Sequence, residues 1–222
     1  MRLLTLARDL TRRKAREREG LFVVEGVRTG EELVRSRLDV VGVLAAPQLA
    51  TSPRGAALLE AFAAKGVLVT HVTDREFQSA AETESPQGLL AVARIPTGQG
   101  LALPSDGTWR PLVLDAVQDP GNVGTLIRTA AGLGASAVFA LPGTVDVWNA
   151  KVVRSAMGAH FHFAAVAMEW ERLQELCATT ETALWGADMG GADVSTLRAP
   201  SRCALVVGNE GSGLSPHVRS AL

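Results

Sequence analysis

The stretch that decides the fold is DAVQDPGNVGTLIRTAAGLGASAVFAL, residues 115–141. An apolar run leads into it, a Pro-Gly pair interrupts that run, and a helical pattern follows. Val123, Leu126 and Ile127 recur at the spacing of one buried helix face, and a second apolar run ends the stretch. Strand, helix and strand in this order predict a βαβ unit, the building block of a parallel sheet.

Two polar residues of the predicted helix point to a possible function. We expect the helix to begin on Asn122, a good N-cap residue, and to present Arg128 beside Thr125 opposite the buried face. One interpretation is a site for an anionic ligand, because helix N-termini and guanidinium groups both attract anions. The other interpretation is structural, with Asn122 only a cap and Arg128 only a solvated helix residue.

The alternation of strands and helices extends in both directions from this stretch. Apolar strands are predicted at 112–117, 136–141, 161–168, 182–188 and 203–208. Strands that are apolar on both faces are typical of a parallel sheet covered by helices on each side. Upstream strands are predicted at 21–26, 40–45, 67–72 and 86–94. The fold class is therefore α/β throughout.

A segment rich in proline and glycine separates the two halves of the chain. Residues 96–111, PTGQGLALPSDGTWRP, contain three prolines and three glycines and show no periodicity. We predict a small α/β domain at 1–95, a linker at 96–111 and a doubly wound α/β domain at 112–222. A chain of 222 residues is long enough for two such cores.

Composition excludes several classes of protein. Hydrophobic residues make up 47% and charged residues 20% of the chain, as in a globular protein of the cytoplasm. No apolar run approaches the length of a membrane span, and the charged N-terminus does not resemble a secretion signal. Cys177 and Cys203 lack metal or redox spacing, so we expect buried thiols. His160 and His162 have no third ligand nearby, so we expect no metal site.

The net charge of −1 hides a basic segment at residues 1–20, called the basic arm below, which holds seven basic and three acidic side chains. A charged first helix is usually a solvated face, with pairs such as Arg13 and Glu17 at i, i+4. The alternative is an arm that binds the phosphate backbone of RNA. Its candidate residues are Arg12, Arg13, Lys14 and Arg16.

A glycine-rich loop after the last predicted strand is the second candidate for chemistry. Residues 205–216, LVVGNEGSGLSP, hold three glycines, and Ser215-Pro216 then begins a helix by a cap-plus-proline pattern. The loop matches neither the dinucleotide fingerprint nor the P-loop. Glu210 at its centre would also repel phosphates. An adenosine that carries a cationic group fits such a loop better.

Taken in this order, the two loops resemble motifs 1 and 2 of the SpoU (TrmH-like) RNA ribose methyltransferases, which belong to the knotted SPOUT class. The matching segments are DPGNVGTLIRTA and VVGNEGSGLS, with KVVRSAMGAHFHF between them. The N-terminal half resembles that family's substrate-binding domain, of ribosomal-protein L30e type, in GLFVVEGVRTGEELV and PQGLLAVAR. The resemblance implies an L30e-like α/β domain followed by a SPOUT-type domain with a parallel sheet and a C-terminal trefoil knot.

The resemblance also implies a reaction, namely transfer of the methyl group of S-adenosylmethionine to a ribose 2′-hydroxyl, most similar to enzymes of large-subunit ribosomal RNA. It assigns the catalytic site to Asn122, Arg128 and Glu210. The cofactor pocket is then lined by Leu141, Gly208, Asn209 and Gly211. In the family the matching arginine is often assigned the role of the base. A guanidinium stays protonated in proteins, so holding the adjacent phosphate or stabilising a developing alkoxide is the alternative role for Arg128.

Three further expectations follow. The family implies a homodimer, and Met157, Phe161 and Phe163 provide more apolar surface than one small sheet needs. The family's third motif is absent after motif 2, so we expect Leu222 not to be the natural terminus and the knot to be incomplete in this form.

Two other functions compete with the enzyme: a noncatalytic RNA-binding protein that keeps the L30e-like domain and the basic arm, and a nucleotide-binding α/β protein of unrelated chemistry.

Overall fold

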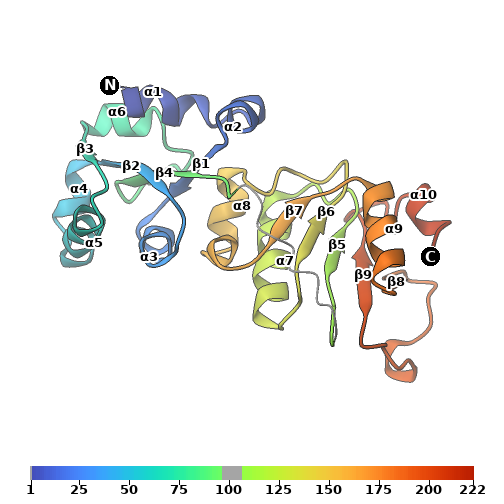
Figure 1. Cartoon of the computed structure of the whole chain (residues 1–222). Coiled ribbons are helices and arrows are strands. Elements are labelled where there is room, and N and C mark those ends of the chain that lie inside the picture. The colour runs from blue at the N-terminus through green and yellow to red at the C-terminus, as the bar shows by residue number, and fades with distance from the viewer. Residues whose placement is uncertain (1, 97–106) are drawn as a thin grey trace. The chain divides into compact units, whose positions relative to one another are not determined.

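The computed structural model in Figure 1 describes residues 2–96 and 107–222. Its contacts form two compact units, and the first combines the N-terminal residues with the segment Trp148–His162. The second contains the remaining described residues. The predicted domain limits assigned 148–162 to the second half of the chain. The segment joins the first unit because the Trp148 ring packs 4.5 Å from that of Phe22. Most of the predicted linker lies outside the described residues.

The first unit is built on a mixed sheet of four strands in the order β1-β4-β2-β3. The strands are β1 (Leu21–Glu25), β4 (Leu89–Arg94), β2 (Val40–Ala45) and β3 (Val69–His71). β4 pairs antiparallel with β1 and β2, and β2 pairs parallel with β3. β1 and β4 are buried almost throughout, so helices must cover both of their faces.

Helices cover the two faces of this sheet. They are α1 (Arg2–Asp9), α2 (Arg13–Glu19), α3 (Val27–Arg35), α4 (Pro47–Ala50), α5 (Pro53–Ala64), α6 (Asp74–Gln78) and α8 (Ala150–Ser155). Leu4 of α1 and Phe77 of α6 belong to one apolar cluster with Leu90 of β4. α3 lies against the opposite face, so close that a Cβ on Gly30 would be 2.1 Å from Leu89 Cδ2. The sequence TDRE at 73–76 predicts a capping box at the start of α6, with Thr73 as the cap and Glu76 reaching back, and the structure confirms it.

The second unit contains the predicted parallel sheet, whose five strands follow the order β7-β6-β5-β9-β8. They are β5 (Leu112–Leu114), β6 (Val138–Ala140), β7 (Ala165–Ala167), β8 (Ala183–Gly186) and β9 (Cys203–Val207). Each strand is shorter than its apolar run predicts. β5 ends before Asp115 because the chain leaves the sheet there, and Ala116 has a φ of 56°.

The helices of this unit make the sheet doubly wound (Figure 1). α7 (Pro120–Gly132) connects β5 to β6, and α9 (Trp170–Thr179) connects β7 to β8, which lies in the opposite direction along the sheet. Right-handed crossovers in opposite directions put the two helices on opposite faces. α9 and the short α10 (Pro216–Arg219) bury Leu173 and Val218 against Phe139 and Val206. Across the described residues, no helix combines the length and apolarity needed to cross a membrane.

Candidate functional site

The candidate site lies where the strand order of the second unit reverses. From β5 the chain proceeds outward through β6 and β7, and it later returns through β8 to β9 on the other side of β5. The loops that follow β5 and β9 therefore meet at the carboxyl edge of the sheet. In open α/β sheets this switch point is where ligands bind. The two loops are the two motifs that the sequence singled out, at 115–119 and 208–215.

The first loop differs from the prediction in how its helix begins. α7 starts at Pro120, and its N-cap is Asp119, whose Oδ1 accepts a hydrogen bond of 2.8 Å from the Asn122 backbone nitrogen. The prediction that the helix begins on Asn122 is wrong, because Asp-Pro already supplies a cap and a first helical residue. The same cap-plus-proline signal was recognised at Ser215-Pro216 and overlooked here. The side chain of Asn122 is thereby available for another contact.

The second loop is closed on itself by short hydrogen bonds. Asn209 and Gly213 exchange backbone bonds of 2.9 and 3.0 Å, and Asn209 Oδ1 accepts from the amides of Gly211 and Ser212. A Cβ on Gly208 would lie 2.2 Å from the carbonyl carbon of Gly213, so only glycine fits there. The amide of Gly211, a residue expected to line the cofactor pocket, donates within the loop.

Glu210 joins the two loops. Its carboxylate accepts hydrogen bonds from Asn122 Nδ2 at 3.0 Å and from the backbone nitrogens of Asp119 at 3.1 Å and Gln118 at 3.3 Å. These bonds, first among them the one from Asn122, lower the pKa of Glu210 to about 2. Glu210 is therefore ionised at any physiological pH and is too weak a base to remove a proton from a hydroxyl. Its geometry instead orients the Asn122 amide.

A second connection between the loops involves residues that the sequence analysis missed. Asp115, 1% exposed, accepts hydrogen bonds from the Ser215 nitrogen at 2.6 Å and from Ser215 Oγ at 3.0 Å. Asn209 Nδ2 adds a third connection by donating to the Ala116 carbonyl oxygen at 2.9 Å. The sequence does carry a signal for this contact. Asp115 is a single carboxylate at the end of an apolar strand, and a carboxylate buried there needs hydrogen-bond donors as partners.

Arg128 lies on the surface of the second unit, whereas the side chain of Leu141 lies in its core. Arg128 is exposed on α7 with Thr125, about 9 Å along the helix axis from Asn122 at the usual helical rise. The Leu141 side chain is buried in the core that α9 covers. Its nitrogen donates to the Leu114 oxygen, and its oxygen accepts from Thr144. Leu141 therefore holds the turn after β6 beside the first loop, and its backbone is already engaged.

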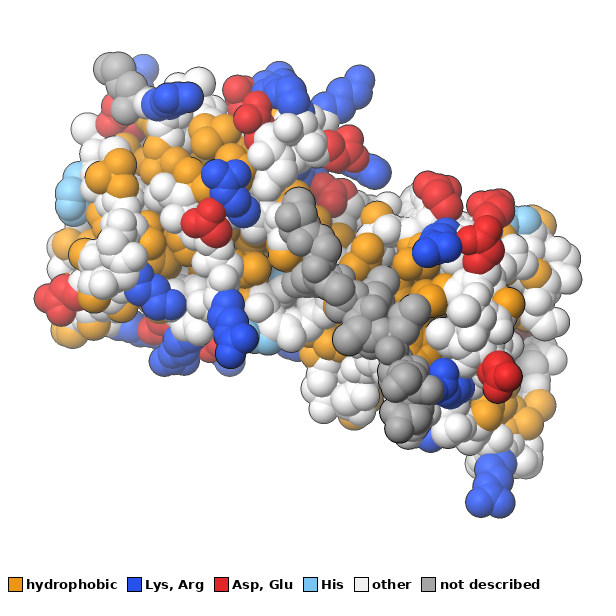
Figure 2. Space-filling model, viewed as in Figure 1, with side chains coloured by type: hydrophobic (Ala, Val, Ile, Leu, Met, Phe, Trp, Pro, Cys, Tyr) orange, Lys and Arg blue, Asp and Glu red, His pale blue; other side chains and the backbone are white. Residues whose placement is uncertain are grey.

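The basic arm is in part a structural element. Arg16, proposed as an RNA contact, is 3% exposed and donates to the carbonyl oxygens of Leu10 and Thr11, so that assignment is corrected. A buried guanidinium that caps carbonyl groups cannot reach RNA. Arg12 and Arg13 are exposed and pair with Asp9 and Glu17. Figure 2 shows blue and red side chains mixed over α1 and α2.

The positions expected for His160, His162 and Phe161 also need correction. The i, i+2 spacing of His160 and His162 predicts that they share one face of a strand. Instead, Gly158, at a φ of 91°, leads into the 3-10 turn η1 (Ala159–Phe161), so the two do not lie on one strand face. His160 is buried, 5.1 Å from the Trp148 ring. Phe161, expected on the surface, is 5% exposed. Among residues 2–96 and 107–222, no group of three His, Cys, Asp or Glu side chains could hold a metal ion.

Comparison with known proteins agrees with this geometry. The model of the SpoU rRNA Methylase family matches residues 110–222, and that of the MRM3-like substrate binding domain matches residues 5–91. The 23S rRNA (guanosine(2553)-2'-O)-methyltransferase RlmP of Bacillus subtilis (strain 168) is 34% identical over 93% of this chain and 79% of its own length. The human mitochondrial rRNA methyltransferase 3 is 31% identical over 77% of this chain and 40% of its own.

Solved structures agree as well. The SpoU methyltransferase AviRb from Streptomyces viridochromogenes, in complex with the cofactor AdoMet, superimposes with a TM-score of 0.86 at 26% identity. The match covers 99% of this chain and 85% of that one. The match therefore extends over both units. This chain belongs to the SpoU rRNA methylase family.

Proposed function

We propose that this protein transfers a methyl group from S-adenosylmethionine to the 2′-hydroxyl of a ribose in large-subunit ribosomal RNA. The observation that carries the proposal is the contact of Glu210 with Asn122, which joins two loops distant in sequence at the switch point of the sheet. Membership of the SpoU rRNA methylase family and similarity to a 23S rRNA 2'-O-methyltransferase support the same reaction.

The residues of the site suit the cofactor. Glu210 is ionised, and Asp115 adds a second carboxylate beneath the loops, so the site favours a cation over a phosphate. Gly208 allows the second loop to close tightly around its own backbone. When bound, S-adenosylmethionine supplies an electrophilic methyl group on a positively charged sulfur. Gly208 and Asn209, at the end of β9, are the residues that would hold it, and Leu141 would shape the pocket by holding the turn after β6.

Each catalytic residue then has a limited role. Glu210 positions Asn122, whose amide is turned with Nδ2 toward the carboxylate and Oδ1 away from it. We assign to that Oδ1 the alignment of the ribose hydroxyl, because a weak nucleophile must be held in line with the methyl group. Arg128 contributes positive charge to the neighbouring phosphate or to the developing alkoxide. As the oxygen–carbon bond forms, the methyl–sulfur bond would break and the hydroxyl proton would pass to water.

We further propose that the protein is a homodimer in the cytoplasm. Met157 and Phe163 are partly exposed apolar side chains that a second copy could cover, although Phe161 is already buried. A monodisperse monomer in light scattering at micromolar concentration would overturn the dimer. Cell fractionation tests the location, since relatives include the mitochondrial human protein.

Methyl transfer to RNA tests the proposed reaction. The full chain is incubated with labelled S-adenosylmethionine and a 23S rRNA transcript, and the RNA is digested to nucleosides for mass spectrometry. We expect one 2′-O-methylated nucleoside. Methylation on a base instead of a ribose would refute the reaction. Binding of S-adenosylmethionine and RNA without any transfer would favour a noncatalytic RNA-binding protein, and calorimetry with the cofactor alone distinguishes that outcome from a failure to bind it.

A further inference from the structure

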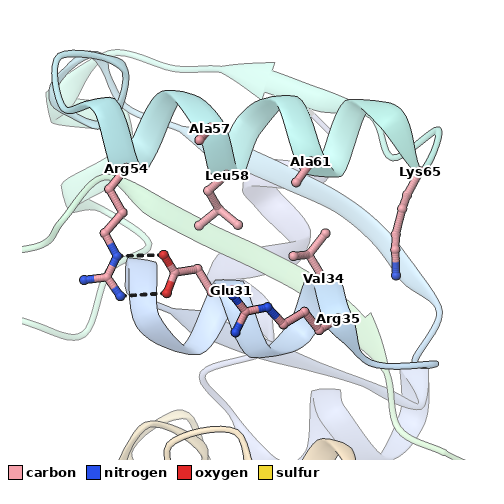
Figure 3. Close-up of a pocket in the computed structure, with 8 residues that line it drawn as sticks. All are labelled: Glu31, Val34, Arg35, Arg54, Ala57, Leu58, Ala61 and Lys65. Atoms are coloured by element: carbon pink, nitrogen blue, oxygen red, sulfur yellow. Dashed lines mark hydrogen bonds and ion pairs between the residues drawn. The ribbon is translucent and has the colours of Figure 1, made fainter.

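An open groove lies between α3 and α5 in the first unit (Figure 3). Its volume is about 580 Å³. The floor is aliphatic and consists of Val34 from α3 with Ala57, Leu58 and Ala61 from α5. Neither the sequence motifs nor the proposed reaction accounts for this groove. It lies within the residues that match the substrate binding domain.

The rim of the groove is positively charged. Arg35, Arg54 and Lys65 line it, against a single lining carboxylate, Glu31. That carboxylate is already used, because Arg54 donates to both of its oxygens at 2.6 Å. The contact with Arg54 lowers the pKa of Glu31, so it stays ionised and paired. Arg35 is exposed and pairs with Glu32 at 3.4 Å, a carboxylate that does not line the groove. Together with Lys65 it leaves the rim with a positive charge, which attracts anions.

The fixed geometry of Arg54 gives the groove a flat polar surface at one end. Two parallel hydrogen bonds to Glu31 hold the guanidinium in one plane (Figure 3). A guanidinium plane is a surface on which unpaired RNA bases stack. Lys65 lies eleven positions further along, just past the end of α5, at about 16 Å by the usual helical rise. A few successive nucleotides can span that distance.

The shape of the groove floor indicates whether a protein helix or unpaired RNA fits there. Ala57 and Ala61 contribute only methyl groups, and Leu58 is 3% exposed, so little apolar area remains to be covered. A protein helix that docks in a groove needs deep pockets for large anchors. The flat face of a nucleobase, with phosphates at the cationic rim, needs only a shallow apolar surface. Both the charge and the shape therefore favour RNA.

We propose that the groove between α3 and α5 binds an unpaired segment of the RNA substrate, with a base on the alanine floor beside Arg54 and phosphates at Arg35 and Lys65. This proposal rests on the proposed function, because it presumes an RNA substrate. It gives the first unit a binding surface distinct from the basic arm. That surface would hold RNA while another segment enters the methyl-transfer site.

The test measures binding of the full chain to a 23S rRNA transcript over a range of salt concentrations. Arg35→Ala and Lys65→Ala are made singly and together, and Arg75→Ala, an exposed arginine on α6, is the matched control. Each groove variant should raise Kd several-fold and lower the salt slope by about one, as loss of one phosphate contact does. The control should leave both unchanged, and all variants should keep the melting temperature of the natural chain.

The stacking surface has a separate test in Glu31→Gln. Removing a negative charge should tighten RNA binding if the groove acts only through charge. If Arg54 must be held flat, the same change should weaken binding, and we expect this result. An excess of single-stranded octauridylate should also compete better than a duplex of equal length. Tighter binding by Glu31→Gln, or equal competition by the duplex, would overturn the proposal.

Methyl transfer measured on the same samples separates the two proposals. If the natural chain methylates the transcript and the double variant at Arg35 and Lys65 has the same Kd, salt slope and KM, the groove proposal is overturned while the function stands. That result would leave the groove to a protein partner. If the natural chain binds the transcript through the groove but transfers no methyl group, the proposed function fails and the groove remains an RNA site.

Discussion

Replacing Glu210 by Gln should loosen the junction of the two motif loops. Gln keeps the shape of the side chain but puts an amide NH₂ where the carboxylate accepts from Asn122 Nδ2 and from the backbone nitrogens of Gln118 and Asp119. At least one donor of the first loop then faces another donor. The first turn of α7 should become less ordered, and the amide of Asn122 should lose its fixed orientation.

The pKa of Glu210 sets the expected magnitude. A fall from the ordinary value of 4.5 to about 2 would correspond to about 3 kcal/mol if all of it were folding free energy. Glu210 is exposed, however, and water screens such contacts, so we expect a loss on the order of 1 kcal/mol. Because the pKa is lower in the folded state, the stabilisation is complete above about pH 4.5 and disappears as the pH falls through 2.

Urea unfolding followed by tryptophan fluorescence, at pH 7 and at pH 2.5, measures this effect. The variant should be less stable than the natural chain at pH 7, and the difference should shrink at pH 2.5. Glu171→Gln, an exposed carboxylate on α9, is the control and should change little at either pH. Equal destabilisation at both pH values would refute the reasoning, because the contact would then not depend on the charge of Glu210. Methyl transfer at pH 7 should fall in kcat.

Four other changes test the site and the arm. Arg128→Ala should abolish methyl transfer while the melting temperature stays within a few degrees, whereas loss of soluble protein would assign Arg128 a structural role. Gly208→Ala should lower Tm, since its Cβ would lie 2.2 Å from the backbone of Gly213, and an unchanged Tm would show that the loop can rearrange. Arg16→Ala should destabilise the chain by about 2 kcal/mol in urea unfolding without changing the salt slope of RNA binding. Charge reversal at Arg12, Arg13 and Lys14 should lower that slope, and an unchanged slope would make the arm only a solvated helix.

Local patterns were sufficient for most of the secondary structure. The cap of α6 and the parallel sheet of the second unit were predicted because capping and strand burial depend on residues close in sequence. The N-cap of α7 was misplaced by three residues because Asn122 and Asp119 are both good caps, and proline decides between them. Strand ends were overestimated because apolar runs continue into turns, as at Leu141.

The roles of individual polar residues were harder to predict. Arg16 belongs to a run of exposed cations, and nothing in its neighbours shows that it turns inward to the carbonyl oxygens of Leu10 and Thr11. Segment 148–162 follows β6 in sequence but packs with the first unit, where Arg154 lies 3.6 Å from the buried carboxylate of Glu25. Burial is a property of the assembled core, so these placements require the tertiary structure.

The sequence by itself determined the α/β class, the two halves of the chain and the two loops that carry the chemistry, because strand period, glycine and proline act over a few residues. Only the tertiary structure decided what those loops do together. Asn122 and Glu210 are 88 positions apart, and Asp115 and Ser215 are 100 apart. Such pairs meet because parallel pairing places β9 beside β5 at the switch point, an arrangement set by the packing of the whole sheet.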